Sequence, residues 1–398
     1  MNPLDIYVNK AVPFKFKGVD LSFDLSHALF SSFDIDAGSR LLLKAIAQNV
    51  EQASVGSIVD IGSGVGVLGI ACAKAYPDSS LLMRDRDALA SAFSERNARR
   101  NRIASVSIDT RLFLEGIEAE RYDLVLCNVP AKAGPPVLDR FLKDIPGILT
   151  ERGTGAIVVV ETIAEAALAS LRASGAEIYR TERGPGHSAF LFRRGSAAAV
   201  EPGAFWGVME RSEQRLRAGK ILYRLKGYWG LQEFDTPSFS SELSMNMAEN
   251  AMAGLHTRRV ALINPGVGRV ACYIGARARG ATIDLCGRDS LSLAVSARNL
   301  ALNAKADTPA GESYSFASKL PDSAYDLLVE TVDPIPRVDT LDDSWASALR
   351  ILKRGGSYIA TMPSAVMDRF EKRKPKGMVK ISGKKKKGFA CASWRLEA

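Results

Sequence analysis

Short apolar runs alternate with amphipathic stretches along the first half of the chain. The amphipathic stretches have helical spacing and predict helices at 66–76, 88–100 and 136–149. The apolar runs predict strands at 57–61, 80–84, 106–108, 122–128 and 155–160, and two last runs at 177–181 and 189–193 predict a hairpin. This alternation is typical of a parallel, doubly wound α/β sheet, in which ligands bind at the carboxyl ends of the strands.

The same pattern occurs twice. Residues 57–66 match 259–268 at an offset of 202, and residues 86–97 match 288–299 at the same offset. Shorter landmarks also recur, with Tyr122-Asp-Leu repeated as Tyr325-Asp-Leu and Phe30-Ser-Ser repeated as Phe239-Ser-Ser. The sequence therefore predicts a tandem duplication.

The duplication predicts two Rossmann-like α/β domains, each a mostly parallel sheet closed by an antiparallel hairpin. Small residues gather near Gly195 and predict a linker at 196–204. We therefore expect a first domain at 1–195 and a second at 205–398.

Composition agrees with a globular protein and excludes several classes. The chain has 398 residues, of which 46% are hydrophobic and 24% charged, so it is not disordered, collagen-like or a disulfide scaffold. The five cysteines form no C-x-x-C pair and no cluster with histidine, so we expect no metal site and a reducing, cytoplasmic location. No apolar run is long enough to cross a membrane, and we expect no membrane partner.

The positive charge is concentrated in one segment. The net charge is +9, and the segment 369–387, with ten Lys or Arg and one Glu, carries all of that excess. Clustered positive charge attracts polyanions through counterion release, so this segment predicts contact with nucleic acid. The alternative is a solvated basic loop that only aids solubility.

A glycine-rich loop at 60–66 follows a predicted strand and opens a predicted helix, and two cofactor classes compete for it. The glycines from Gly64 onward satisfy a G-x-G-x-x-G pattern, and Asp85 lies where a ribose-binding acid is expected in dinucleotide enzymes. Asp60, however, places a carboxylate in the loop. A carboxylate repels a pyrophosphate and favours a cationic cofactor such as S-adenosylmethionine. A purely structural strand–turn–helix is the third possibility.

A further motif, Asn128-Val129-Pro130, ends the fourth predicted strand. Together with residues 30–43, 60–66 and Asp85, it resembles the class I S-adenosyl-L-methionine-dependent methyltransferases. The resemblance is greatest to the small-domain group that includes the ribosomal RNA guanine-N2 methyltransferases. It covers residues 10–195 well and the second half more faintly.

This resemblance implies the site residues and the chemistry. The implied cofactor site consists of Asp60, Gly62, Gly64, Gly66, Asp85 and Asp109. The implied catalytic motif is Asn128-Val129-Pro130. In it, the Asn128 side chain and the Val129 carbonyl accept hydrogen bonds from a planar exocyclic amine. They orient this amine for attack on the sulfonium methyl group. Such a displacement needs positioning and no metal.

Two residues depart from the family motif. Val129 and Ala131 stand where the family has the central proline, directly after the Asn, and an aromatic that stacks on the base. Stacking is worth about 1–3 kcal/mol per base, so another aromatic must supply it or the substrate is not a base. Phe30 and Phe33 are the candidates, and Lys132 is a candidate phosphate contact.

The second copy lacks the polar residues of the first. Leu262, Gly287 and Thr331 stand in place of Asp60, Asp85 and Asn128, which predicts a non-catalytic duplicate. Its segment 377–394 predicts a hairpin with a basic tip at 382–387. The tip lysines suited to RNA phosphates are Lys384, Lys385, Lys386 and Lys387. The family resemblance also implies that a degenerate domain serves RNA binding.

The leading hypothesis is an S-adenosylmethionine-dependent N-methyltransferase that acts on structured RNA, ribosomal RNA in the first place, at an exocyclic base amine such as guanine N2. Its partner is then ribosomal RNA or a ribosomal subunit. One alternative is a methyltransferase for a small molecule or a protein amide or amine. The other is a non-enzymatic RNA-binding or assembly module that has kept only the fold.

Overall fold

The computed structural model describes residues 4–30, 33–199, 205–233, 236–253, 256–304 and 309–397. The chain divides into two compact units, Met1–Met209 and Glu210–Ala398. A short helix, α6 (Phe205–Met209), belongs to the first unit. The predicted linker at 196–204 lies partly outside the described residues, so its limits stay a prediction. Among the described residues, no helix is both long and apolar enough to span a membrane.

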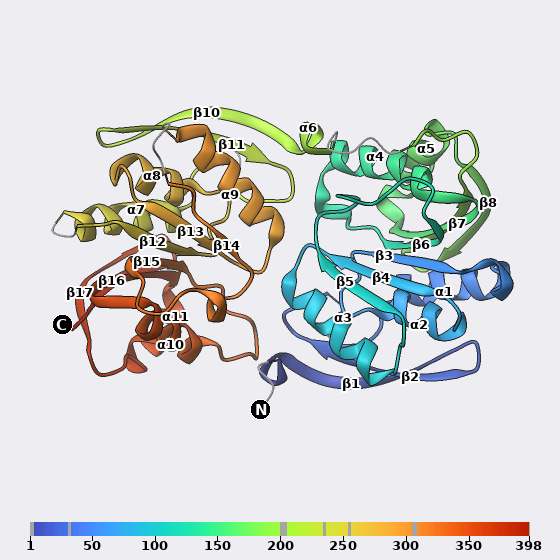
Figure 1. The fold of residues 1–398 in the computed structure, drawn as a ribbon, viewed down its shortest axis with the longest axis horizontal. Coiled ribbons are helices and arrows are strands. Elements are labelled where there is room, and N and C mark those ends of the chain that lie inside the picture. Colours follow the sequence, from blue (N-terminus) through green and yellow to red (C-terminus); the bar gives the residue numbers. More distant parts are fainter. Residues whose placement is uncertain are drawn as a thin grey trace. The chain divides into compact units, whose positions relative to one another are not determined.

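The first unit is built on a seven-stranded sheet in the order β5-β4-β3-β6-β7-β9-β8 (Figure 1). The first five of these strands in the sheet are parallel, and β9 and β8 close the sheet as an antiparallel hairpin. The strands are β3 (Ser57–Ile61), β4 (Ser80–Asp85), β5 (Val106–Thr110), β6 (Tyr122–Asn128), β7 (Leu149–Val160), β8 (Glu177–Gly184) and β9 (His187–Arg193). Every strand predicted in this half is confirmed, and so is the fold class.

The helices of the first unit are α1 (Ala37–Asn49), α2 (Val67–Ala75), α3 (Ala88–Arg100), α4 (Pro135–Asp144) and α5 (Ala164–Ala173). The helix predicted at 136–149 was too long, because it stops at Asp144 and continues only as a 3-10 turn over Ile145–Ile148. Pro146 lacks a backbone N–H and disfavours further α-helix at this point. Helices α1 and α5 were not predicted from the sequence.

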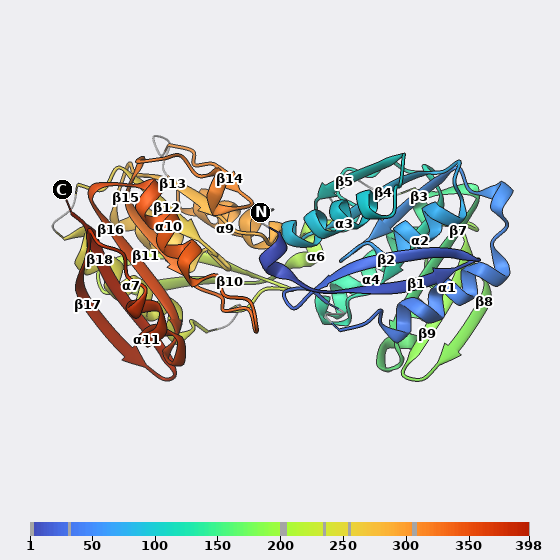
Figure 2. The ribbon, with the colours of Figure 1, turned by 90° about the horizontal axis from the view of Figure 1, so that it is seen from below.

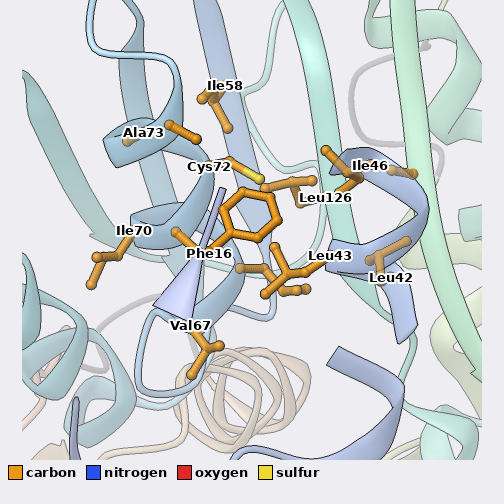
Figure 3. Packing of buried hydrophobic residues seen from close by; sticks show 14 of the residues in the cluster. Phe16, Leu42, Leu43, Ile46, Ile58, Val67, Ile70, Cys72, Ala73 and Leu126 are labelled. Carbon is orange, nitrogen blue, oxygen red and sulfur yellow. The ribbon is translucent and has the colours of Figure 1, made fainter. Parts of the chain in front are cut away.

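An N-terminal hairpin, β1 (Val8–Phe16) and β2 (Val19–Ser26), was not predicted either. Two asparagines of α3 hold it. The Asn97 amide accepts from Asp24 N (2.8 Å) and donates to the carbonyls of Asp24 and Val65. Asn101 bonds the backbone of Ser22 in the same way. From this hairpin Phe16, 6% exposed, packs into the core beside side chains of α1 and α2 (Figure 3).

The second unit repeats this architecture. Its sheet has the order β14-β13-β12-β15-β16-β18-β17 and it carries its own N-terminal hairpin, β10–β11 (Figures 1 and 2). The strands are β10 (Glu210–Ala218), β11 (Ile221–Tyr228), β12 (Arg259–Ile263), β13 (Thr282–Cys286), β14 (Ser313–Tyr314), β15 (Tyr325–Thr331), β16 (Leu352–Pro363), β17 (Met378–Lys386) and β18 (Phe389–Leu396). The helices are α7 (Phe239–Met252), α8 (Arg269–Arg277), α9 (Ser290–Asn303), α10 (Leu341–Ile351) and α11 (Ser364–Lys372).

The repeat extends to individual hydrogen bonds. Asn299 and Asn303 of α9 hold the backbone of Lys226 and Arg224, as Asn97 and its neighbour do in the first unit. Helix α1 begins at the N-cap Asp36 and α7 at the N-cap Ser238, which keeps the offset of 202.

One predicted landmark is therefore wrong. Phe239 is the first residue of α7, whereas Phe30 precedes α1, so Phe30-Ser-Ser and Phe239-Ser-Ser are not structural equivalents. Ser31 and Ser32 lie outside the described residues.

The basic segment of the second unit forms the predicted hairpin. Strand β17 is the edge of the sheet, and its partner β18 pairs with it as far as Lys386 and Phe389 (Figure 2). The tip is therefore shorter than the expected 382–387. It is a two-residue turn at Lys387 and Gly388, with φ of 47° and 84°.

Candidate functional site

The glycine loop of the first unit leaves room for a ligand. Gly62 and Gly64 have φ of 75° and 57°, and a Cβ at either position would meet no described atom within 4 Å. Gly66 differs, because its Cβ would lie 2.7 Å from Ile70 Cδ1. The first two glycines thus expose bare backbone, whereas the third allows α2 to pack. The loop precedes α2, whose N-terminus is directed to the same place.

Asp60 lies beneath this loop at the end of β3 and is 1% exposed. Its Oδ2 accepts a hydrogen bond from Gly69 N (2.8 Å), whereas its Oδ1 is buried with no hydrogen-bond partner among the described residues. Burial raises the pKa of the Asp60 carboxyl to about 7; the Gly69 N–H opposes this shift and the nearby Asp85 adds to it. A buried carboxyl group with one unpaired oxygen is stabilised when a cation or a hydrogen-bond donor binds beside it.

Asp85 ends β4 and ties the loop to the sheet. Its Oδ2 accepts from Gly64 N and its Oδ1 from Asp87 N, both at 2.9 Å. Each carboxylate oxygen has more than one lone pair, so both can accept a further hydrogen bond. The site therefore offers two acceptors for hydroxyl groups next to the open glycines.

Asp109, at the end region of β5, is engaged elsewhere. Its Oδ1 and Oδ2 accept from Arg84 Nε (2.8 Å) and Nη2 (2.6 Å). Arg84 is 2% exposed and also donates to the carbonyls of Phe113 and Glu115. This bidentate pair fixes the loop that follows β5.

Asn128 ends β6, the neighbour of β3, and its amide is held from α1. Its Nδ2 donates to Asp36 Oδ1 (3.1 Å) and lies 3.4 Å from Ser39 Oγ. Asp36 is the N-cap of α1 and accepts from Ser39 N (2.9 Å). Because the amide nitrogen is occupied, Oδ1 is the atom available to accept from a ligand.

The residues after Asn128 are placed by the sheet and by a short turn. Val129 is buried and its N–H donates to Val158 O (2.9 Å). Pro130 is exposed, and Lys132 is exposed in the 3-10 turn Ala131–Ala133.

Sequence reasoning missed the supporting role of α1. The signal was present, because Asp36 lies three residues before Ser39, the spacing of an N-cap. Gly38 is also required here, since its Cβ would lie 2.9 Å from His187 Cδ2 and 3.0 Å from Asp36 Oδ1.

Two exposed aromatic side chains precede α1. Phe30 is 73% exposed and Phe33 is 55% exposed, so neither is a core residue. The Phe33 ring makes an edge contact with His27, with centroids 5.2 Å apart. The segment that carries them leads directly into the N-terminus of α1, where Asp36 holds Asn128.

The equivalent place in the second unit is filled by its own side chains. Leu262 replaces Asp60, and Asn264 Nδ2 donates to Thr331 O (2.9 Å) across the gap between the loop and β15. A Cβ at Gly287 would meet Asn264 Oδ1 at 3.4 Å. Asn264 thus occupies space that the first unit leaves open, which agrees with the prediction of a degenerate copy.

Comparison with known proteins agrees with this geometry. Residues 20–178 match the family model of the methyltransferase small domain. The ribosomal RNA small subunit methyltransferase C of Pasteurella multocida is 34% identical over 117 residues, which are 29% of this chain and 34% of that protein. The ribosomal RNA large subunit methyltransferase G of Photobacterium profundum is 36% identical over 127 residues, 31% of this chain and 32% of that protein.

One solved structure resembles the whole chain. The T. thermophilus 16S rRNA N2 G1207 methyltransferase (RsmC), in complex with AdoMet and guanosine, has a TM-score of 0.69 at 15% identity and covers 98% of this chain and 99% of its own. The sequence matches are shorter. The chain spans only about a third of the length of those two curated relatives. It spans 61% of the uncharacterized protein YbxB of Bacillus subtilis, which is 32% identical over 31% of this chain.

Both units have a class I methyltransferase fold, and the first unit carries the polar glycine loop. More specifically, residues 20–178 of the first unit match the methyltransferase small domain family. The resemblance inferred from the sequence is confirmed.

Proposed function

We propose that the chain is an S-adenosylmethionine-dependent N-methyltransferase that acts on structured RNA, ribosomal RNA in the first place, at an exocyclic base amine such as guanine N2. One observation carries the proposal. Buried Asp60 and the oriented amide of Asn128 lie at the carboxyl ends of β3 and β6, which are neighbours in the sheet. The family match over residues 20–178 and the named functions of the relatives support it.

The first unit fits the cofactor. The unsatisfied Oδ1 of Asp60 would face the cationic methionine end, and the open Gly62 and Gly64 would let the cofactor lie against the backbone. Gly66 shapes the turn, and Asp85 would accept from the ribose hydroxyls. When bound, S-adenosylmethionine supplies a methyl group activated by a positively charged sulfur. Asp109 is not part of this set, because its charge is neutralised by the bidentate ion pair with buried Arg84.

The substrate amine would be oriented by two acceptors. The Asn128 Oδ1 and the Val129 carbonyl accept its two N–H groups, and Pro130 restricts the backbone that follows. Two acceptors fix the plane of the amine and draw electron density toward its nitrogen. Asp36 and Ser39 contribute by holding the Asn128 side chain in one rotamer before substrate arrives.

The aromatic and basic groups would hold the RNA. Phe30 is exposed and can stack on the target base, which compensates for Ala131 in the motif. Lys132 and the tip lysines of β17–β18 are exposed and can contact phosphates. Five buried free cysteines agree with the cytoplasmic location that we propose.

The test is Asn128→Ala assayed for both binding and transfer. We expect S-adenosylmethionine affinity to change less than about threefold, because in this proposal Asn128 binds the substrate amine and not the cofactor. Methyl transfer to unmethylated ribosomal RNA should fall at least about 100-fold, as for the loss of a positioned acceptor. Pro136→Ala, an exposed residue of α4, is the control and should transfer normally. Full activity of Asn128→Ala would refute the mechanism.

A further inference from the structure

The second unit contains a cavity of about 830 Å³. It lies between the hairpin β10–β11 and the helices α7 and α8, with Ala218, Tyr223, Met245 and Tyr273 among its lining residues. Ligand sites in proteins commonly measure about 300–1,000 Å³. The cavity is therefore large enough for a nucleotide.

Among the residues that line the cavity, Ala218 replaces a side chain that forms packed core in the first unit. The hairpins and the helices α2 and α8 correspond at the offset of 202, so Ala218 stands for Phe16 and Ala278 for Tyr76. Phe16 and Tyr76 are 6% and 1% exposed, and Figure 3 shows Phe16 filling the space between its neighbours. Two large side chains that fill the first unit are thus absent from the second.

The second unit has not merely lost volume, because its remaining wall is more polar. Arg269 replaces Val67, Tyr273 replaces Ala71 and Tyr223 replaces Leu21 at the same offset. Arg269 is 2% exposed and donates to Glu233 (3.2 Å), and Tyr273 donates to Glu249 (2.7 Å). These buried polar groups have hydrogen-bond partners, so the polar wall of the cavity is held in place.

The rim of the cavity carries uncompensated positive charge. Arg277 is paired with Glu249, whereas Arg217, Lys220 and Arg279 are exposed and form no ion pair with any described residue. The acid on the rim, Glu242, is paired with Lys386. The free charge at the opening is therefore positive, which favours an anionic occupant.

The same Lys386 makes the cavity continuous with the basic hairpin. It pairs with Glu242 and lies 5.0 Å over the ring of Phe239, the first residue of α7. Two other lysines of the hairpin, Lys384 in β17 and Lys387 in the turn, have no ion pair with described residues. The unpaired lysines of the hairpin and the unpaired cations of the rim thus lie on surfaces joined by the Lys386–Glu242 pair, which suits a polyanion better than a single small anion.

We infer that the cavity of the second unit binds a nucleotide of a single-stranded RNA segment. The base enters between the Tyr223 and Met245 wall and the side chain of Ala218, with rim guanidinium groups available for stacking. The flanking phosphates lie on Arg217, Lys220 and Arg279 and continue toward the lysine turn. This inference rests on the proposed function, because it assigns the RNA substrate a second contact away from the methylated base.

The test is to refill the cavity as the first unit does, with Ala218→Phe in the full chain. The probe is a fluorescein-labelled single-stranded RNA of about 12 nucleotides, and its affinity is measured by anisotropy over a salt series. We expect Ala218→Phe to weaken RNA binding at least about tenfold, because the added ring occupies the space proposed for the base. Leu222→Phe, which adds the same ring to an exposed position of the hairpin, should change binding less than about twofold.

A surface variant guards against misfolding of the filled protein. Arg279→Gln should weaken RNA binding about threefold and lower the salt slope, whereas Arg354→Gln, an exposed arginine of β16 outside the cavity, should not. RNA affinity unchanged in both Ala218→Phe and Arg279→Gln would overturn the inference.

Methyl transfer separates this inference from the proposed function. If both Ala218→Phe and Arg279→Gln bind the oligonucleotide normally while the wild type methylates ribosomal RNA, only the cavity assignment fails. If the wild type methylates no RNA but Ala218→Phe still loses the oligonucleotide, the cavity assignment stands and the proposed function fails.

Discussion

Asp60 gives the most quantitative prediction. Burial raises the pKa of its carboxyl from 3.8 to about 7 in the folded protein. The folded state therefore holds this proton more tightly than the unfolded state. The contribution of Asp60 to stability is full below about pH 4 and is lost as the pH rises through 7. This rise in the pKa corresponds to on the order of 4 kcal/mol of lost stability at pH 8.

Asp60→Asn removes the loss of stability that ionisation of the buried carboxyl causes. It keeps the hydrogen bond from Gly69 N, because the asparagine oxygen can accept it. We expect the variant to be about 2–4 kcal/mol more stable than the wild type at pH 8 and equally stable near pH 4. The measurement is the free energy of urea unfolding of the ligand-free protein between pH 4 and 9. Asp78→Asn, on the surface, makes the same chemical change and should shift stability by less than about 0.5 kcal/mol.

The result that refutes the reasoning is a stability difference that does not grow with pH. A variant less stable than the wild type at pH 8 would also refute it, since Asp60 would then be held by a partner that burial and geometry do not reveal. Either result would remove the argument that the loop is built to receive a cation.

Three further predictions concern binding. A cationic ligand lowers the pKa of Asp60, so S-adenosylmethionine should bind about tenfold more tightly at pH 8 than at pH 6 by calorimetry, with proton release near pH 7; a flat profile would contradict this. Asp85→Ala should weaken cofactor binding at least about tenfold, because acceptors for the ribose and the Gly64 N–H are lost, and unchanged affinity would place the ribose elsewhere. Replacing Lys384 and Lys387 by Gln should reduce the salt slope of RNA binding by about 0.7–0.9 per lost phosphate contact. The reduction should exceed that from replacing Lys385 and Lys386, which already pair with Asp368 and Glu242. Equal slopes in the two variants would mean that the turn only aids solubility.

The sequence contained most of the fold. Buried parallel strands read as continuous apolar runs, and the 202-residue offset placed the second sheet on the first. The N-terminal hairpins were not predicted, because β1 and β2 gain their stability from Asn97 and its neighbours on α3, a contact across about 70 residues that no local pattern signals. Helix α4 was predicted too long because helical spacing continues past Pro146 although the helix does not.

The polar residues of the site were predictable from their place at strand ends, but their state was not. No pattern reveals that Asp60 keeps one oxygen unsatisfied, that Arg84 occupies Asp109, or that Asp36 holds Asn128. The cavity of the second unit was equally hidden. Ala218 in a polar strand carries no signal until its counterpart Phe16 is seen in a packed core.

The central claim is that the first unit transfers a methyl group to an exocyclic amine of RNA. The most direct measurement incubates the full chain with S-adenosylmethionine carrying a labelled methyl group and unmethylated ribosomal RNA, followed by nuclease digestion and mass spectrometry of the nucleosides. We expect the label on an exocyclic base nitrogen, as N2-methylguanosine, and none with Asn128→Ala. Label on a ring carbon, on a ribose or on no nucleoside, in a protein that binds the cofactor, would contradict the claim.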